Sequence, residues 1–265
     1  MSAAALKWIA LVLMLVDHIG EFFGGITPVW FRWLGRLSAP LFLFCLAKGL
    51  EKTRSRPRYL RRLWIGSAVM GCSSFVLSLL FPMAPVPVSN NIFSTMAVIA
   101  AMVWIFESYG QSSARKDNLP KPDMALGIFA AVQTLSGLAC AFAEQWGKPW
   151  VRLINGLVPN LVYCEGSIEV VILGLIFFYL GKSRRKLCLG YGIYCAAQFL
   201  SSVIMAVEYG RMSYVVLYFY QWMMIGSLPL MLCYNGQRGR QNGRVFYLFY
   251  PLHIWALYLL SNLLA

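Results

Sequence analysis

The sequence is poor in charge and especially poor in acid. Charged residues make up 12% of its 265 residues, with 10 Asp and Glu against 23 Lys and Arg. A soluble domain carries about 25% charged residues, so this chain has too little polar surface to cover a globule of its size. The hydrophobic share of 59% supports the same conclusion. We therefore expect an integral membrane protein.

Several other signatures are missing. The seven Cys residues are scattered, with no C-x-x-C motif and no Cys/His pair at metal-binding spacing, so we expect no structural metal and no disulfide framework. The N-terminal apolar run has no small-x-small cleavage site before Asp17, so we expect no cleaved signal peptide. The net charge of +13 lies in short clusters between apolar runs. This placement is typical of the positive-inside rule and of contact with anionic lipid, not of a nucleic-acid partner.

What the sequence does contain is a series of apolar runs of membrane length, about 20 residues each. They predict an all-α, polytopic membrane helix bundle in a single domain over 1–265. For residues 144–163, a tenth membrane span and a re-entrant helix both remain as interpretations. The nine expected helices cover roughly 6–23, 30–50, 63–81, 92–110, 124–143, 161–181, 187–207, 213–233 and 245–264.

Basic loops alternate along the chain with loops that have almost no net charge. By the positive-inside rule this alternation places the N-terminus in the cytoplasm and the C-terminus on the far side. We expect the cytoplasmic (inner) membrane as the location. The basic loops are 48–62, 111–123, 182–186 and 235–244, and the intervening ones are 24–29, 82–91 and 208–212.

The only two His residues lie inside apolar runs. His18 follows Asp17 in the first run and His253 lies in the last. Ionisable groups within a bilayer are costly and usually functional. We expect Asp17, His18, Arg36 and Glu169 to meet in a polar pocket that opens outward, with His253 extending it toward the centre.

Lys7 precedes His18 by eleven residues, close to three helical turns, so both side chains face nearly the same side. A cation at the cytoplasmic mouth and a base deeper in the membrane suit a long ligand with phosphate at the mouth. Asp17 is adjacent to His18 and points ~100° away from it. We therefore expect Asp17 to pair with Arg36 and not with His18.

Simpler interpretations stay open for each of these groups. An intramembrane His can bond a neighbouring helix as a packing residue, and Arg36 can extend to the outer interface. The basic loop 48–62 can act only as a topology signal. Glu165 and Glu169 can be residues of the outer interface.

Four segments carry a family resemblance. They are LKWIALVLMLVDHIG (6–20), FRWLGRLSAPLFLFCLAKGLEKTRSRPRYLRRL (31–63), NIFST (91–95) and RVFYLFYPLHIWAL (244–257). Together they resemble the TraX family of membrane proteins, named for the acetylase of conjugative pilin. TraX-like proteins are similar to transmembrane acyltransferases of the acyltransferase-3 type, which carry a basic residue, ten intervening positions and a His on the first helix. Lys7 and His18 have this spacing, although that branch often has Arg in place of Lys7.

The resemblance implies a membrane-embedded acetyltransferase. It would move an acetyl group from cytoplasmic acetyl-CoA to an amine or hydroxyl acceptor, such as a peptide N-terminus, a glycan or a lipid. His18 would be the general base, with Asp17, Arg36 and His253 in the catalytic set. The residues implied for CoA phosphates are Lys7, Lys52, Arg54, Arg58, Arg61 and Arg62, and those implied for the acceptor are Asn91, Glu165, Glu169 and Tyr250.

Two other functions fit the same residues. A proton-coupled transporter or flippase also places His and carboxylates in a helix bundle, although the sequence has no visible internal repeat of the kind common in transporters. A non-catalytic membrane assembly factor would use the buried polar groups only to fix the register of its helices.

Overall fold

The computed structural model describes residues 1–81, 86–110, 121–240 and 243–264, and this part of the chain contains helices and no strand. Residues 111–120 of the expected basic loop lie outside the described residues, as do 82–85 and 241–242 of two other loops. The elements are α1 (Ala3–Phe22), α2 (Trp30–Gly35), α3 (Ser38–Lys52), α4 (Arg56–Leu80), α5 (Ile92–Gly110), α6 (Pro122–Ala143), η1 (Glu144–Trp146), α7 (Lys148–Leu157), α8 (Ser167–Leu180), α9 (Arg184–Glu208), α10 (Tyr214–Leu217), η2 (Tyr220–Ser227), α11 (Leu228–Leu232) and α12 (Gly243–Leu264).

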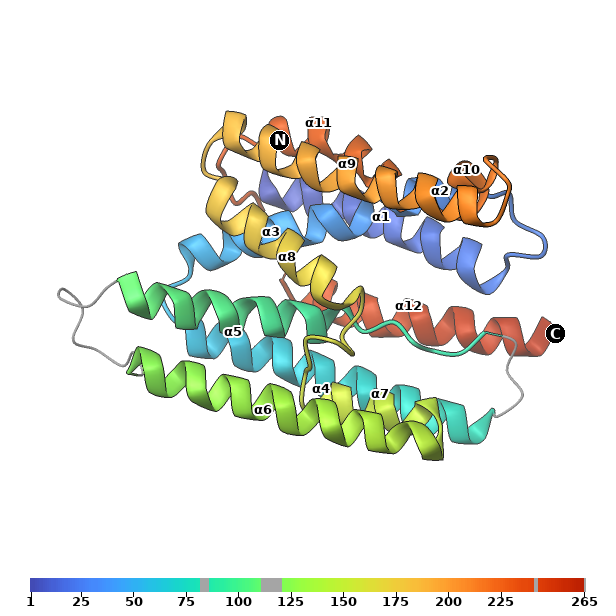
Figure 1. The fold of residues 1–265 in the computed structure, drawn as a ribbon, viewed down its shortest axis with the longest axis horizontal. Helices are drawn as coiled ribbons and strands as arrows, with labels where there is room; N and C mark the ends of the chain where they lie inside the picture. The colour runs from blue at the N-terminus through green and yellow to red at the C-terminus, as the bar shows by residue number, and fades with distance from the viewer. Residues whose placement is uncertain (82–85, 111–120, 241–242, 265) are drawn as a thin grey trace. The chain divides into compact units, whose positions relative to one another are not determined.

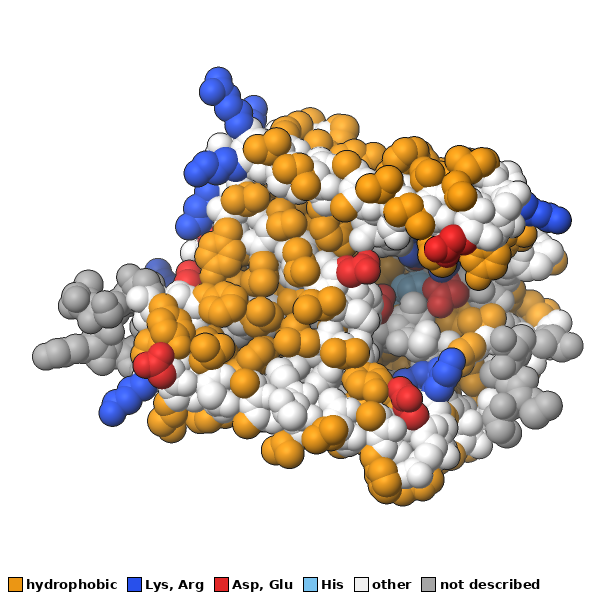
Figure 2. Space-filling model, viewed as in Figure 1, with side chains coloured by type: hydrophobic (Ala, Val, Ile, Leu, Met, Phe, Trp, Pro, Cys, Tyr) orange, Lys and Arg blue, Asp and Glu red, His pale blue; other side chains and the backbone are white. Residues whose placement is uncertain are grey.

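The expectation of a polytopic helical membrane bundle is confirmed. Among the described residues, seven helices are long and apolar enough to cross a membrane, so the chain is an integral membrane protein. Hydrophobic side chains also cover much of the face in Figure 2. The seven are Ala3–Phe22, Trp30–Lys52, Arg56–Leu80, Ile92–Tyr109, Pro122–Trp146, Arg184–Glu208 and Val245–Leu264.

The expected count of nine is wrong for the described residues. The run at 161–181 forms α8, which has 14 residues and is shorter than the roughly 20 that a span needs. The run at 213–233 is divided into α10, η2 and α11, with Tyr218 and Phe219 outside any helix between the first two, so it contains no continuous α-helix of membrane length. Residues 144–163 contain η1 and α7, and the 10 residues of α7 are too few to form a tenth span.

The helices form two compact units. The first unit comprises residues 1–48 and 176–265, and the second unit comprises 49–175. The boundaries fall within α3 and α8. The expectation of a single domain over 1–265 stays a prediction.

In the first unit, α1 and α12 run parallel along a common seam. Lys7 and His18 of α1 contact Phe246 and His253 of α12, and Phe22 packs against the ring of Tyr258. Contacts therefore advance in the same direction along both helices. The chain start is tied to the segment after α11, since the Ala3 N–H donates to Gln237 O at 2.9 Å.

The second unit packs α4, α5, α6 and α7 side by side (Figure 1). The backbones of α4 and α7 approach closely, and a Cβ on Gly71 would lie 2.6 Å from the Cα of Gly156. The hydroxyl of Ser67 donates to the Gly156 carbonyl at 2.9 Å across the same contact. Small residues at such positions let membrane helices approach closely. An ion pair between Arg56 and Glu107 at 2.8 Å joins α4 to α5.

Candidate functional site

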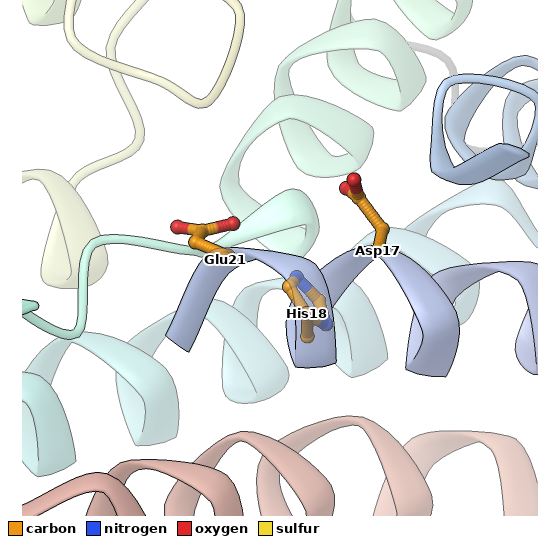
Figure 3. A group of neighbouring side chains, drawn as sticks. All are labelled: Asp17, His18 and Glu21. Carbon is orange, nitrogen blue, oxygen red and sulfur yellow. The ribbon is translucent and has the colours of Figure 1, made fainter. Parts of the chain in front are cut away.

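The site is built on α1, where three ionisable side chains follow one another inside a membrane span. Asp17 and Glu21 are four residues apart and therefore share a face of the helix. His18 points to a different side, toward α12 (Figure 3). Asp17 is 8% and His18 4% exposed. One helix thus presents two carboxylates to one neighbour and an imidazole to another.

Two arginines of the α2 region meet the carboxylates. Arg36 Nη2 donates to both carboxylate oxygens of Asp17, at 2.7 and 2.5 Å. Arg32 Nη1 lies 3.0 Å from Asp17 Oδ1 and 3.0 Å from Glu21 Oε2. The predicted pairing of Asp17 with Arg36 is confirmed. We call Asp17, Glu21, Arg32 and Arg36 the charge cluster; its two negative and two positive formal charges cancel.

Two glycines allow this close approach of α1 and α2. A Cβ on Gly35 would collide with the side chain of Asp17, and a Cβ on Gly20 would lie 2.9 Å from the Cβ of Phe31. Arg36 also contacts a third segment, because its Nη1 donates to Gln221 Oε1 at 3.2 Å in η2. The charge cluster therefore joins α1, the α2 region and η2 within the first unit.

His18 and His253 form a second polar contact, which we call the His pair. His18 Nδ1 and His253 Nε2 are 2.7 Å apart, and His253 Nδ1 lies 2.7 Å from the carbonyl oxygen of Phe249. A carbonyl only accepts, so His253 Nδ1 carries the proton and its Nε2 accepts from His18 Nδ1–H when both rings are neutral. The unprotonated nitrogen of His18 is then Nε2. The hydrogen-bond chain thus selects one tautomer for each ring.

Aromatic rings enclose the His pair. Phe249 stacks on His253 with ring centroids 4.8 Å apart, and Tyr250 meets both imidazoles edge-on, at 5.8 Å from His253 and 6.5 Å from His18. His253 is 7% exposed. The structure therefore places Tyr250, an expected acceptor-binding residue, beside the expected base.

The side chains of Asp17, His18 and Glu21 offer ligand atoms within 4.8 Å of one another, close enough to hold a metal ion. Both carboxylates are engaged by arginine, however, and His18 Nδ1 by His253. A cation at this place would have to compete with two guanidinium groups. These residues fit an ion-pair network better than a metal centre, and the expected absence of a metal stays a prediction.

The remaining expected site residues fall into two groups. Lys7 is half-buried in the first unit, with its Nζ 5.6 Å from the centre of the Phe246 ring. In the second unit, Glu165 Oε2 accepts from the Asn91 N–H at 2.6 Å, so these two expected acceptor-binding residues are in contact. Glu169 is exposed in α8. The expected phosphate-binding residues are all exposed in the second unit: Lys52, Arg54, Arg58, Arg61 and Arg62.

Sequence reasoning missed Glu21, Arg32 and Gln221. A signal for the first two was present, because Glu21 follows Asp17 and Arg36 follows Arg32 by four residues each. Two acids and two bases, each pair spaced by one helical turn on successive helices, are typical of a paired charge network. Gln221 gave no such signal.

Two comparisons with known proteins cover nearly the whole chain. The profile of the TraX family, described as TraX protein, matches residues 2–261. The chain is also 28% identical over 261 residues to a protein of Dichelobacter nodosus named "Probable fimbrial assembly protein FimC, serogroup H1", and the alignment spans 96% of this chain and 93% of that protein. No solved structure matches.

These findings contradict the expected function of a membrane acetyltransferase with an unspecified acceptor. The relative that aligns almost end to end is named for fimbrial assembly, and neither description mentions acetyl transfer. The similarity to acyltransferase-3 enzymes stays a prediction that neither finding tests. The expected family is confirmed, since its profile matches 2–261, including the segment 110–160 that the four resembling segments leave out. The chain belongs to the TraX family.

Proposed function

We propose that this chain is a membrane-embedded factor in the assembly of fimbriae and that it acts on the fimbrial subunit. The supporting observation is the nearly end-to-end correspondence with a relative named as a fimbrial assembly protein. The alignment covers 96% of this chain and 93% of the relative, so a role in fimbrial assembly would be carried out by the helical region that the two proteins have in common. A fimbria is a polymer of protein subunits, so a membrane factor in its assembly must bind or modify a subunit.

The first unit contains the residues suited to this role. Charged and titratable groups inside a membrane span are costly and usually functional. The charge cluster is balanced and internally bonded, whereas the two rings of the His pair share a hydrogen bond that continues to the Phe249 carbonyl, which offers a path along which a proton can move. We therefore assign the stabilising role to the charge cluster and the functional role to the His pair.

The orientation belongs to this proposal too. In the first unit the Lys48 Nζ donates to the Gly181 carbonyl at 2.9 Å, next to the basic residues Lys182 to Lys186. Figure 2 shows Lys and Arg side chains gathered at the edge of the molecule where α9 begins. By the positive-inside rule this end faces the cytoplasm of the inner membrane. The N-terminus of the chain, and with it the first residues of the parallel helices α1 and α12, would then also lie on the cytoplasmic side.

Modification of the subunit is the form of this role that membership of the TraX family favours. Acetyl-CoA as donor, and Lys7 with the exposed basic residues as its phosphate contacts, stay predictions. A subunit modified by this protein would differ in mass between a strain that has the gene and one that lacks it. The same strains thus test both the assembly role and the modification.

The experiment is a gene deletion complemented with variants. Surface fimbriae are counted by electron microscopy, and subunit mass and membrane levels of the protein are measured in parallel. We expect the deletion to remove fimbriae, and His18→Ala to lower their number at least about tenfold at unchanged membrane level. Ser202→Ala removes a buried hydroxyl of α9 that donates to the Gln198 carbonyl of its own helix, and is the matched control. Normal fimbriation of the deletion strain would overturn the proposal.

A further inference from the structure

An apolar groove lies between α4 and α5 of the second unit, two of the helices that are long and apolar enough to cross a membrane. Its volume is about 350 Å³, within the range of about 300–1,000 Å³ that ligand sites occupy. The α4 side is formed by Pro57, Leu60, Arg61 and Trp64, which share one helix face because they follow at helical spacing. Among the described lining residues, Arg61 is the one that carries a charge.

Small side chains on α5 leave the space for this groove. Ala97, Ala101 and Trp104 line it at helical spacing, and the methyl groups of the two alanines fill little of the space beside α4. The opposite wall is held in place, because the Trp64 indole N–H donates to the Leu157 carbonyl at 2.8 Å. A pre-formed wall lowers the ordering cost of binding a ligand.

The two helices run antiparallel, and this sets the direction of the groove. The start of α4 meets the end of α5 at the ion pair of Arg56 with Glu107, 2.8 Å long. Farther along α4, the Ser67 carbonyl accepts from Asn91 Nδ2 at 3.1 Å, directly before α5 begins. The groove therefore extends from the basic start of α4 toward the middle of the span. Its α4 side, 57–64, is ~10 Å long.

Arg61 lines this groove without an acid partner. It is exposed, and among the described residues it makes no hydrogen bond or ion pair, whereas Arg56 of the same helix is held by Glu107. Its guanidinium has five donors in a geometry that matches phosphate, and its long side chain can reach the membrane interface. An apolar groove with a cation on its wall complements an amphiphile that has an anionic head and an apolar tail.

The basic residues at the start of α4 also act as a topology signal under the positive-inside rule. That rule counts charges near the end of a span and requires none of them beside a hollow. Arg58 and Arg62 meet it from positions outside the groove lining. The rule therefore accounts for the basic helix start, but it gives no reason for Arg61 to border an apolar groove.

We propose that this groove binds one acyl chain of an anionic membrane phospholipid, with the phosphate at Arg61 and the first methylene groups between α4 and α5. Because both helices are membrane spans, a lipid can enter from the bilayer. The site belongs to the second unit, whereas the His pair belongs to the first. It does not depend on the proposed role in fimbrial assembly.

Native mass spectrometry of the full chain in detergent tests the proposal. The protein is offered phosphatidylglycerol and phosphatidylcholine with identical acyl chains. Both lipids have the phosphate, but the choline headgroup adds a cation for which the described lining has no acid. We expect retention of phosphatidylglycerol to exceed that of phosphatidylcholine at least about fivefold. Equal retention of the two lipids would overturn the proposal.

A charge variant separates the groove from a general attraction of anionic lipid to a basic protein. Arg61→Gln removes the cation of the groove. Lys121→Gln is the matched control, because Lys121 is exposed directly before α6, at the end of the unit where the Tyr109 hydroxyl donates to Asp123 Oδ1 at 2.8 Å. We expect at least about fivefold weaker retention of phosphatidylglycerol in Arg61→Gln and no change in Lys121→Gln. Equal effects of the two variants would overturn the site.

A second pair of variants tests the position of the acyl chain. Ala101→Phe fills the groove, and Ala130→Phe adds the same bulk at an exposed position of α6 in the same unit. We expect at least about fivefold weaker retention in the first variant alone, and no displacement of the lipid by millimolar glycerol phosphate. Full retention in a folded Ala101→Phe protein, or displacement by glycerol phosphate, would refute the chain in the groove. If Ala101→Phe fails to fold, Arg61→Gln still decides, since it changes an exposed side chain.

Discussion

Replacing Asp17 by Asn should destabilise the protein strongly although it changes little in volume. Asp17 receives bonds from Arg36 at 2.5 and 2.7 Å and lies 3.0 Å from Arg32. Without its charge, the cluster changes from neutral to a net charge of one positive unit inside a membrane span. Removing one partner of a buried ion pair costs about 3–5 kcal/mol, and an uncompensated Arg in a span costs about 2.5–3.5 kcal/mol on insertion scales.

The two ranges meet at about 3 kcal/mol, roughly a hundredfold in the ratio of folded to unfolded protein. We use the low end because the side chains of Asp17 and Arg36 keep 11% and 20% exposure. The double variant Asp17→Asn/Arg36→Gln restores charge balance between Glu21 and Arg32. We therefore expect it to be more stable than the sum of the two single variants by on the order of 2 kcal/mol.

The measurement is reversible unfolding in mixed micelles, followed by circular dichroism. Glu208→Gln is the matched control, because it removes the same charge from an exposed position at the end of α9 in the same unit. A free energy of unfolding for Asp17→Asn within about 0.5 kcal/mol of wild type would contradict the assignment. Strict additivity in the double variant would contradict it as well, since independent sites add.

Three further predictions concern helix contacts, measured by the same unfolding assay, and the His pair, measured by NMR. Gly35→Ala should lower stability by about 1–3 kcal/mol because its methyl group collides with a carboxylate of the charge cluster. Gly192→Ala should be neutral or slightly stabilising, because among the described residues its methyl group would meet nothing within 4 Å beyond the adjoining backbone of its own helix. His253→Gln should keep the His18 tautomer, because the Gln side-chain oxygen can accept from His18 Nδ1–H, whereas the shorter side chain of His253→Asn cannot reach it. Identical ¹⁵N chemical shifts of His18 in the two variants would contradict this prediction. Gly156→Ala should cost about 1–3 kcal/mol by separating two backbones in contact, and a cost equal to that of Gly192→Ala would refute that contact.

Sequence patterns predicted the long helices because each is a continuous apolar run. The runs that became α1, α4, α5, α6, α9 and α12 have the length that a bilayer requires. The run at 213–233 is also apolar, yet its first helix ends at Leu217 and the chain continues as the 3-10 helix η2. Counting apolar residues records transfer into lipid and is insensitive to where a helix is interrupted, so it made this segment a span.

Of the two polar contacts on α1, the sequence predicted one and did not predict the other. The pairing of Asp17 with Arg36 was predictable, because helix geometry turns Asp17 away from His18 and toward a different neighbour. The bond between His18 and His253 joins residues 235 positions apart, and its register depends on how α1 and α12 pack. Sequence could suggest that both His share a pocket, but not that one ring fixes the tautomer of the other.

The two polar groups on α1 should therefore separate in experiment. The charge cluster is balanced, and both of its acids, Asp17 and Glu21, are paired with arginine, so its variants should mainly reduce the amount of folded protein in the membrane. The His pair contributes one hydrogen bond between two rings and no ion pair, so truncating it removes less stabilisation and more chemistry. If fimbriation falls in proportion to membrane level in the variants of Asp17, but falls at constant level in those of His18, then neighbouring residues of one helix serve stability and function respectively. If both sets of variants lower only the membrane level, the His pair is a packing contact and the functional residues lie elsewhere in the chain.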